Sequence, residues 1–331
     1  MDQVLKIISE LYSIENLKLL HRVEEGVLSN NYILEADGQK YFLKHHRSNI
    51  VHKIGQIHQV EKYFSQQGFP VILALPTKDN KLYFTSEDQY YSLLPFTPGK
   101  LVKRESLSGN QIKAMGEFLA KLHLAGKNHD EFKLEALKSV NGENFSQFVT
   151  DIQSKLKEKP NLTPVDIMAA EHLELQKQLA DKIGYKIFSP QLPSDHLVHG
   201  DYHDYNLFFD EFDQITALFD FEKTEMSLRT FELIRALEIV CFHGSFKQNN
   251  FANAQVFLQA YHSLYPVVPE ELEEAINFSY LGRVFSTWIT GDVYLKGNSR
   301  PAVYLHETHF NLKYFSSHLD YFKSQLLSYI K

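Results

Sequence analysis

Two aspartates and an asparagine lie at a spacing that could serve phosphoryl transfer. The segment 199–206 reads HGDYHDYN, so Asn206 follows Asp201 by five residues, and Asp220 ends a later apolar run. Phosphoryl transfer needs a base that orients the acceptor hydroxyl and oxygen ligands for a Mg²⁺ ion that bridges two phosphates. Carboxylate and amide oxygens are suitable ligands for this hard cation. We therefore predict that Asp201 is the catalytic base and that Asn206 and Asp220 hold magnesium.

These motifs resemble those of the aminoglycoside phosphotransferase and choline kinase family, within the protein-kinase-like superfamily. The segment 199–206 is similar to the family's catalytic loop. Asp220-Phe221-Glu222 is similar to its metal-binding triplet, with an acid where protein kinases carry glycine. The resemblance extends over most of the chain and implies an ATP- and Mg²⁺-dependent kinase of a small-molecule hydroxyl. It also implies an α+β fold of two lobes, a small β-rich N-terminal lobe and a larger, mainly helical C-terminal lobe.

The segment 231–237 is similar to the homoserine-kinase-like branch of this group more than to the antibiotic-resistance enzymes. It reads FELIRAL, with Glu232 where many members carry aspartate. The exact acceptor stays open at this point, because loops that vary across the group decide it.

The resemblance also assigns residues to the nucleotide. Lys44 ends a strand-like run, YFLK, and resembles the lysine that pairs with the α- and β-phosphates, while Glu61 resembles the helix glutamate that orients this lysine. A buried lysine needs such a partner. His199 is expected to be a buried histidine that holds loop backbone, and Glu222 is expected to support the metal site.

The segment 25–32 looks like the hairpin loop that covers the phosphates, although it holds a single glycine. Backbone N–H groups and the side chains of Ser29 and Asn30 would contact the phosphates there. The segment 91–96, which includes Leu94, resembles the hinge where the adenine edge meets the backbone.

Each of these residues alone has an ordinary structural explanation. Lys44 could be a solvated edge lysine, Glu61 a surface charge on an amphipathic helix, and Ser29 and Asn30 part of a turn. The order in which all the motifs occur favours the kinase interpretation, because independent signals agree on one architecture.

The pattern of the chain predicts a β-rich start and a helical remainder. Two alternating runs, 31–36 and 40–44, flank Asp37-Gly38, which is a strong hairpin signal. A helix is predicted over 54–67, and further strands over 81–85 and 90–94. Proline and glycine at 95–99 then mark a boundary, so we predict a nucleotide-binding lobe at 1–95 and a catalytic and acceptor-binding lobe at 96–331.

Beyond this boundary helical periodicity dominates, interrupted by one β-like segment at 196–220 that carries the motifs. Helices are predicted at 108–125, 142–157, 164–183, 229–242, 252–265, 269–295 with a possible break, and 306–330.

Composition restricts the class of protein. The 331 residues carry a formal charge of −7, which argues against nucleic acid as a partner. The single cysteine, Cys241, cannot form an intramolecular disulfide, which fits a reducing, cytoplasmic compartment. No apolar run reaches the roughly 18 residues of a membrane span.

Two competing functions remain open from sequence: a protein Ser/Thr kinase of the same superfamily, and an inactive nucleotide-binding scaffold. Among small acceptors, amino sugars, amino alcohols such as homoserine, choline-like amines and sugars all remain. Glu222, Glu225 or Asp292 would suit a cationic acceptor, whereas Arg283 would suit a carboxylated one.

Overall fold

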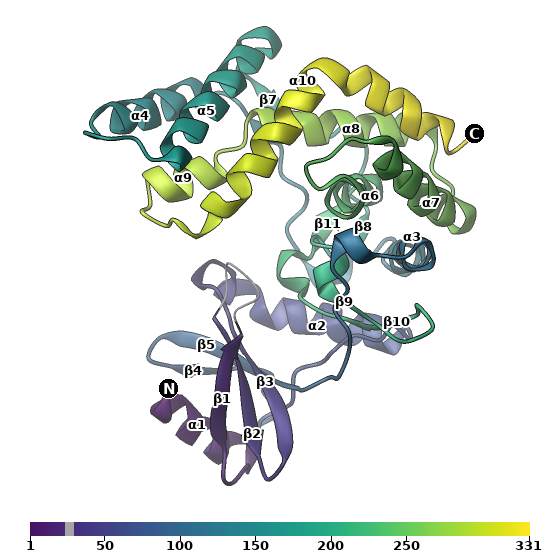
Figure 1. Ribbon diagram of the computed structural model, residues 1–331. Coiled ribbons are helices and arrows are strands. Elements are labelled where there is room, and N and C mark those ends of the chain that lie inside the picture. Colours follow the sequence, from purple (N-terminus) through teal and green to yellow (C-terminus); the bar gives the residue numbers. More distant parts are fainter. Residues whose placement is uncertain (24–29) are drawn as a thin grey trace. The chain divides into compact units, whose positions relative to one another are not determined.

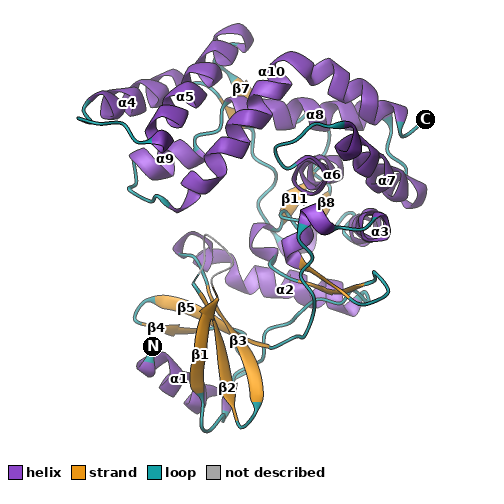
Figure 2. Ribbon diagram, viewed as in Figure 1, coloured by secondary structure: helices purple, strands orange, loops and turns teal. Residues whose placement is uncertain are grey.

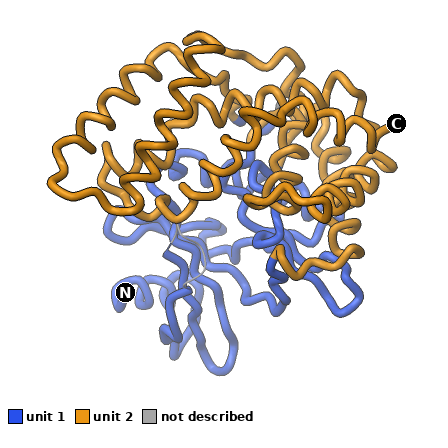
Figure 3. The backbone as a smooth tube through the Cα atoms, turned by 45° about the horizontal axis from the view of Figure 1, so that its top comes forward, with its two compact units in different colours: residues 1–103, 130–134, 199–224 blue, residues 104–129, 135–198, 225–331 orange. Residues whose placement is uncertain are grey.

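The chain folds into two compact units, each assembled from separate stretches of sequence (Figure 3). The computed structural model describes residues 1–23 and 30–331. Unit 1 contains residues 1–103, 130–134 and 199–224, and unit 2 contains residues 104–129, 135–198 and 225–331. The motif-bearing residues 199–224 therefore group with the N-terminal part of the chain. The division into a lobe at 1–95 that binds the nucleotide and a lobe at 96–331 that binds the acceptor stays a prediction.

Unit 1 is built on a five-stranded antiparallel sheet with the strand order β1-β2-β3-β5-β4 (Figure 1). Its strands are β1 (Lys18–Val23), β2 (Asn31–Ala36), β3 (Gln39–His45), β4 (Phe84–Ser86) and β5 (Gln89–Pro95). The predicted Asp-Gly hairpin between β2 and β3 is confirmed, because Asp37 and Gly38 both have positive φ, 49° and 82°. Such angles match the right-handed twist of the two flanking strands.

Two helices accompany this sheet. Helix α1 (Asp2–Tyr12) packs Val4 and Ile8 against the buried strand residues Leu34, Leu43 and Leu93. Helix α2 (Ile54–Gln66) follows a 3-10 turn at Ser48–Lys53 and ends just before Gly68, which has a φ of 87°. The buried face of α2 includes polar residues as well as apolar ones, and these polar residues matter for the site below.

The motif-bearing segment adds a second, small sheet to unit 1. Strands β9 (Leu207–Phe209) and β10 (Ile215–Leu218) form an antiparallel hairpin. Short 3-10 turns lie at Asp204–Asn206, before β9, and at Phe221–Lys223, after β10. Because a hairpin returns the chain to its starting edge, the residues just before β9 and just after β10 lie at the same end.

Unit 2 is mainly helical, and Figure 2 shows the contrast with the strands of unit 1. Its helices are α3 (Gly109–Ala125), α4 (Phe145–Lys157), α5 (Pro164–Ile183), α6 (Arg229–Leu237), α7 (Gln248–Leu264), α8 (Pro269–Val284), α9 (Trp288–Tyr294) and α10 (Leu305–Ser328). Short strand pairs join β6 (Val140–Asn141) with β7 (Ile187–Phe188) and β8 (His196–Val198) with β11 (Glu225–Ser227). The prediction of an α+β fold with a β-rich N-terminal part is confirmed.

Local sequence explains several helix boundaries in unit 2. Thr163 caps α5, with Pro164 at the first helical position and Asp166 bonding back to the Thr163 backbone. This capping box satisfies N–H groups that a helix start otherwise leaves without partners. The predicted helix 229–242 is an α-helix to Leu237, and a π-helical turn over Glu238–Phe242 continues it. The helix predicted over 269–295 is broken into α8 and α9.

No helix among residues 1–23 and 30–331 is long and apolar enough to cross a bilayer.

The backbone of unit 1 requires glycine at one position in the motif-bearing segment. Gly200 has a φ of 81°, and a Cβ placed there would lie 2.0 Å from the carbonyl oxygen of Lys223. Both the positive φ and this close approach of backbone therefore exclude other residues.

We predict that Gly200→Ala destabilises the protein more than Gly184→Ala does. Gly184 also has a positive φ, 90°, but a Cβ there meets nothing within 4 Å. Gly184→Ala should cost about 1–2 kcal/mol from left-handed strain alone. Gly200→Ala should cost roughly a further 1–3 kcal/mol, because an atom is forced into packed backbone. Urea unfolding of both variants measures the difference, and equal losses would contradict the steric argument.

Candidate active site

The catalytic-loop segment is held by His199, which is fully buried. Its Nε2 lies 2.9 Å from the carbonyl oxygen of Phe219, and its Nδ1 accepts from the backbone N–H of Asp201 at 3.2 Å. The ring therefore donates through Nε2 and accepts through Nδ1, which fixes one neutral tautomer. One imidazole thus ties the backbone of the proposed base to the residue that precedes Asp220.

The carboxylate of Asp201 lies between two basic side chains. Lys223 Nζ is 2.8 Å from one oxygen, and His203 Nε2 is 3.8 Å from the other. The side chain retains 17% exposure. A carboxylate next to a lysine is favoured in its charged form, which is the form that can accept a proton or orient a hydroxyl.

The β9–β10 hairpin brings the two predicted magnesium ligands to the same end of one small sheet. Asn206 precedes β9, Asp220 follows β10, and the backbone N–H of Phe219 donates to the Asn206 carbonyl at 3.2 Å. The Asn206 amide nitrogen donates to the Asp201 carbonyl at 2.9 Å, which leaves the amide oxygen for a cation. The Asp220 side chain is 41% exposed. One amide and one carboxylate oxygen are a donor set that fits Mg²⁺.

The triplet 220–222 is anchored by its central residue. Phe221 is fully buried, and its ring stacks on Phe64 of α2 at 5.7 Å and lies 4.4 Å from His199. On one side of this anchor Asp220 has a φ of 70°. A left-handed aspartate costs conformational energy, and such strain is typical of functional positions.

Lys44 forms ion pairs with both acids of the triplet. Its Nζ lies 2.7 Å from Asp220 Oδ1 and 3.2 Å from Glu222 Oε1. Burial by itself would lower the pKa of Lys44, but the carboxylates of Asp220 and Glu222 raise the pKa well above its ordinary value. The lysine is therefore cationic, as a phosphate ligand must be.

Glu222 is a buried acid, 4% exposed, that three basic residues surround. Besides Lys44, the guanidinium of Arg47 donates to Glu222 Oε2 at 2.9 Å, and His46 Nδ1 lies 3.6 Å from Oε1. Burial would raise the pKa of Glu222, yet Lys44, His46 and Arg47 hold that pKa far below its usual range. Glu222 is thus a fixed anion that supports the site.

Among the described residues Lys44 and Glu61 form no direct ion pair, although the charge of Glu61 is one of those that raise the pKa of Lys44; the assignment of Glu61 to the nucleotide site stays a prediction. In the described part of the chain, the carboxylate of Glu61 contacts His58 Nδ1 at 2.7 Å instead. Each of the two residues has a different partner nearby. His58 lies one helical turn before Glu61 and binds it, while Glu222 supplies Lys44 with a carboxylate that a glycine at that position could not.

The other residues predicted to bind the nucleotide are Asn30, Leu94 and Ser29. The side chain of Asn30 accepts from the guanidinium of Arg22. Leu94 lies in β5 and pairs with Phe42 of β3, so the predicted hinge is the end of a sheet strand. Ser29 and most of the predicted phosphate-covering loop lie outside the described residues.

Sequence reasoning missed four neighbours of the site: Lys223, Arg47, His46 and His58. His46 and Arg47 lie two and three residues after Lys44, and Lys223 directly follows the acidic triplet. A cluster of basic residues just after each motif was the available signal. It indicates charge, but it does not indicate which acid each base contacts.

Three of the charged residues that were considered for acceptor binding, Glu222, Asp292 and Arg283, have partners within their own units. In unit 2, Arg283 donates to the buried Glu238, and Asp292 pairs with Lys296 at 2.9 Å. In unit 1, Glu222 is paired as described above. Neither a cationic nor a carboxylated acceptor is favoured by these side chains.

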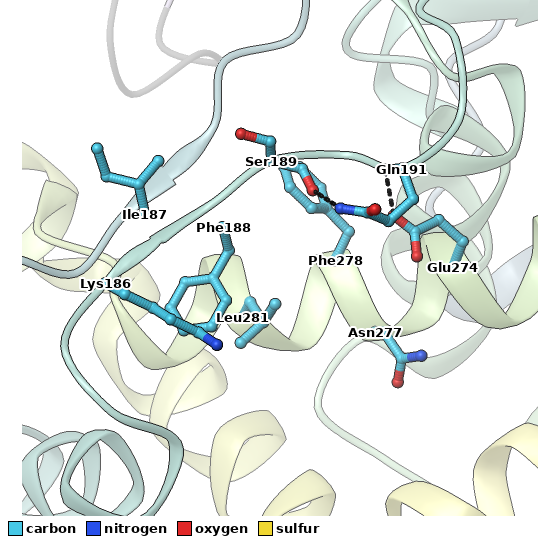
Figure 4. A pocket seen from close by; sticks show the side chains of 9 residues that line it. All are labelled: Lys186, Ile187, Phe188, Ser189, Gln191, Glu274, Asn277, Phe278 and Leu281. Atoms are coloured by element: carbon cyan, nitrogen blue, oxygen red, sulfur yellow. Dashed lines mark hydrogen bonds between the residues drawn. The ribbon is translucent and has the colours of Figure 1, made fainter.

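Unit 2 contains a pocket of about 270 Å³ between the segment 186–191 and helix α8 (Figure 4). Its rim is fixed by Gln191, whose backbone N–H donates to Glu274 at 2.8 Å. None of the predicted site residues lines this pocket.

The chain is similar to several known phosphotransferases. A homoserine kinase of Caulobacter vibrioides is 22% identical over 82% of this chain and 81% of its own length. Among solved structures, a spectinomycin phosphotransferase in complex with ADP and spectinomycin has a TM-score of 0.65 at 15% identity, covering 98% of both chains. A microcompartment-associated aminopropanol kinase has a TM-score of 0.62 at 13% identity, covering 99% of both chains.

The pattern of the phosphotransferase enzyme family matches residues 20–268. This stretch contains the catalytic loop, the acidic triplet and Lys44, and it is most of the chain. The protein belongs to the phosphotransferase enzyme family and is a small-molecule kinase of the protein-kinase-like superfamily.

Proposed function

We propose that the protein transfers the γ-phosphate of Mg-ATP to the hydroxyl of a small amino alcohol, with homoserine as the first candidate. The observation that carries this proposal is the joint position of Asp201, Asn206 and Asp220 around one hairpin, with Lys44 bound to Asp220. This arrangement offers a base, two oxygen ligands and a cation, which are the groups that phosphoryl transfer needs.

In the proposed mechanism Asp201 accepts a hydrogen bond from the acceptor hydroxyl and orients its oxygen for attack on the γ-phosphorus. The bond from the attacking oxygen to phosphorus forms as the bond to the β-phosphate oxygen breaks, and the hydroxyl proton passes to Asp201. Lys223 Nζ lies 2.8 Å from Asp201 and forms an ion pair with this carboxylate. Because the transition state is loose, positioning and charge neutralisation matter more than a strong base.

Asn206 and Asp220 hold the metal in this proposal. Bound Mg²⁺ supplies positive charge to the β- and γ-phosphates. Lys44 would contact the phosphates and exchange its bond with Asp220 for one with a phosphate oxygen. Its second partner, Glu222, is buried and stays in place during this exchange.

The acceptor class rests on the relatives. The homoserine kinase and the aminopropanol kinase are named for acceptors that carry an amino group and a hydroxyl on a short carbon chain. Spectinomycin, named for another relative, is a larger molecule. Amino alcohols are therefore the first acceptors to test, followed by amino sugars and choline-like amines.

A protein acceptor fits the chain less well. Only eight residues separate Asp220 from the first residue of α6, Arg229, and three of them form β11. This leaves little length for the activation segment on which protein kinases dock a peptide.

The deciding experiment measures ADP release with Mg-ATP across homoserine, aminopropanol, choline, amino sugars and neutral sugars, with Asp201→Asn beside the wild type. We expect turnover with an amino alcohol. Asp201→Asn should lower kcat by about 10²–10⁴-fold, the usual contribution of a general base, while Mg-ATP still binds. Full activity in Asp201→Asn would show that another group is the base. If the wild type binds Mg-ATP but releases no ADP with any acceptor of the panel, a protein acceptor or a scaffold function would instead be favoured.

A second prediction concerns the metal. Asp220→Ala removes a charged oxygen ligand, so the Mg²⁺ concentration that half-saturates turnover should rise at least about tenfold. Asp320→Ala is the matched control, since this acid on α10 is fully exposed and the charge change is the same. Mg²⁺ titrations at fixed ATP measure both variants. An unchanged Mg²⁺ requirement in Asp220→Ala would remove Asp220 from the metal site.

A further inference from the structure

A buried chain of polar side chains runs through unit 1 between helix α2 and the acidic triplet. It starts at Glu61, which contacts His58 Nδ1 at 2.7 Å. His58 Nε2 lies 3.1 Å from Ser92 Oγ, and His46 Nε2 lies 2.8 Å from the same oxygen. His46 Nδ1 then faces Glu222 Oε1 at 3.6 Å. All five residues are buried, and Ser92 is fully buried.

The register of the sheet places this series of side chains beside Lys44. Ser92 of β5 is directly opposite Lys44 of β3, so the two side chains point to the same face. His46 follows β3, and its backbone N–H donates to the carbonyl of Tyr90 at 2.9 Å. The serine is therefore fixed between the helix and the lysine strand.

The hydroxyl of Ser92 has one proton, and it donates to the carbonyl oxygen of Leu82 at 2.9 Å. Its oxygen can accept from the Nε2–H of His46, and it also contacts Nε2 of His58, whose Nδ1 donates to the Glu61 carboxylate. One oxygen atom thus holds two imidazole rings, which contact each other edge to face at 6.1 Å. Removing this oxygen would leave two buried imidazole nitrogens, one on His46 and one on His58, without this partner, which is costly inside a protein.

We infer that His58, Ser92 and His46 are positioning residues that connect Glu61 to Glu222, and through Glu222 hold the phosphate-binding Lys44. The Glu–His–Ser–His–Glu relay links helix α2 to the lysine indirectly, where a direct lysine–glutamate pair was expected. This inference rests on the proposed function, because it assigns Lys44 to the nucleotide phosphates. Because the relay residues are buried, we expect their effect on nucleotide binding to pass through Glu222 and Lys44.

The test compares Ser92→Ala with Ser86→Ala. Both serines are buried in adjacent strands of one sheet, but Ser86 Oγ has no hydrogen-bond partner among residues 1–23 and 30–331, so its removal breaks no bond described there. The dissociation constant of Mg-ATP, measured by calorimetry, should rise about tenfold in Ser92→Ala, which corresponds to about 1.4 kcal/mol. It should stay within twofold of wild type in Ser86→Ala. His58→Gln, which breaks the relay at a second point, should change in the same direction as Ser92→Ala.

A double-mutant cycle separates positioning from general destabilisation. If the relay acts through Lys44, the Ser92→Ala change should raise the dissociation constant by less than twofold in a Lys44→Met background. The same tenfold rise in both backgrounds would overturn the inference, and so would unchanged binding in both Ser92→Ala and His58→Gln. If the wild type itself fails to bind Mg-ATP, the proposed function fails and the inference with it. Binding by the wild type with no effect of the relay variants refutes the relay alone.

Discussion

The buried carboxylate of Glu222 is the constraint on which the rest of the site depends. A charge removed from water must be paired and hydrogen-bonded, or it destabilises the fold by several kcal/mol. Glu222 meets this need with Lys44 at 3.2 Å, Arg47 at 2.9 Å and His46 at 3.6 Å, which all come from the end of β3 and the residues after it. The acidic triplet and the lysine strand are therefore joined by charge. Replacing the acid with the glycine of protein kinases would leave Arg47 without this partner.

Much of the fold could be predicted because its signals are local. The Asp-Gly turn at 37–38, the stop of α2 before Gly68 and the Thr163–Pro164 start of α5 each depend on a few neighbouring residues. The proximity of Asn206 to Asp201 is also local, since five residues of one loop separate them. The side-chain amide of Asn206 reaches the Asp201 carbonyl directly. Short-range geometry of this kind is readable from spacing alone.

Partner choice between distant residues could not be predicted in the same way. Lys44 and Asp220 are 176 positions apart, and the lysine has three acids whose charges act on it: Asp220, Glu222 and Glu61. Sequence spacing does not rank these acids. The outcome was decided by His58, a neighbour of Glu61 on the same helix face, which forms its own bond to that acid. The resemblance named Lys44 and Glu61 but gave no sign of His58, which contacts Glu61 instead.

This pairing has a consequence for how the proposed nucleotide would be accommodated. Before ligands bind, Lys44 neutralises Asp220, so the more exposed acid is not left as a bare charge. In the proposed mode of binding, Asp220 would hold the metal and Lys44 would contact a phosphate oxygen, so each ion would exchange one partner and none would be left alone. Such an exchange requires that the lysine keep one partner throughout. The buried Glu222, which Arg47 binds and His46 faces at 3.6 Å, is the acid that can remain, because its bond to Arg47 does not depend on the nucleotide.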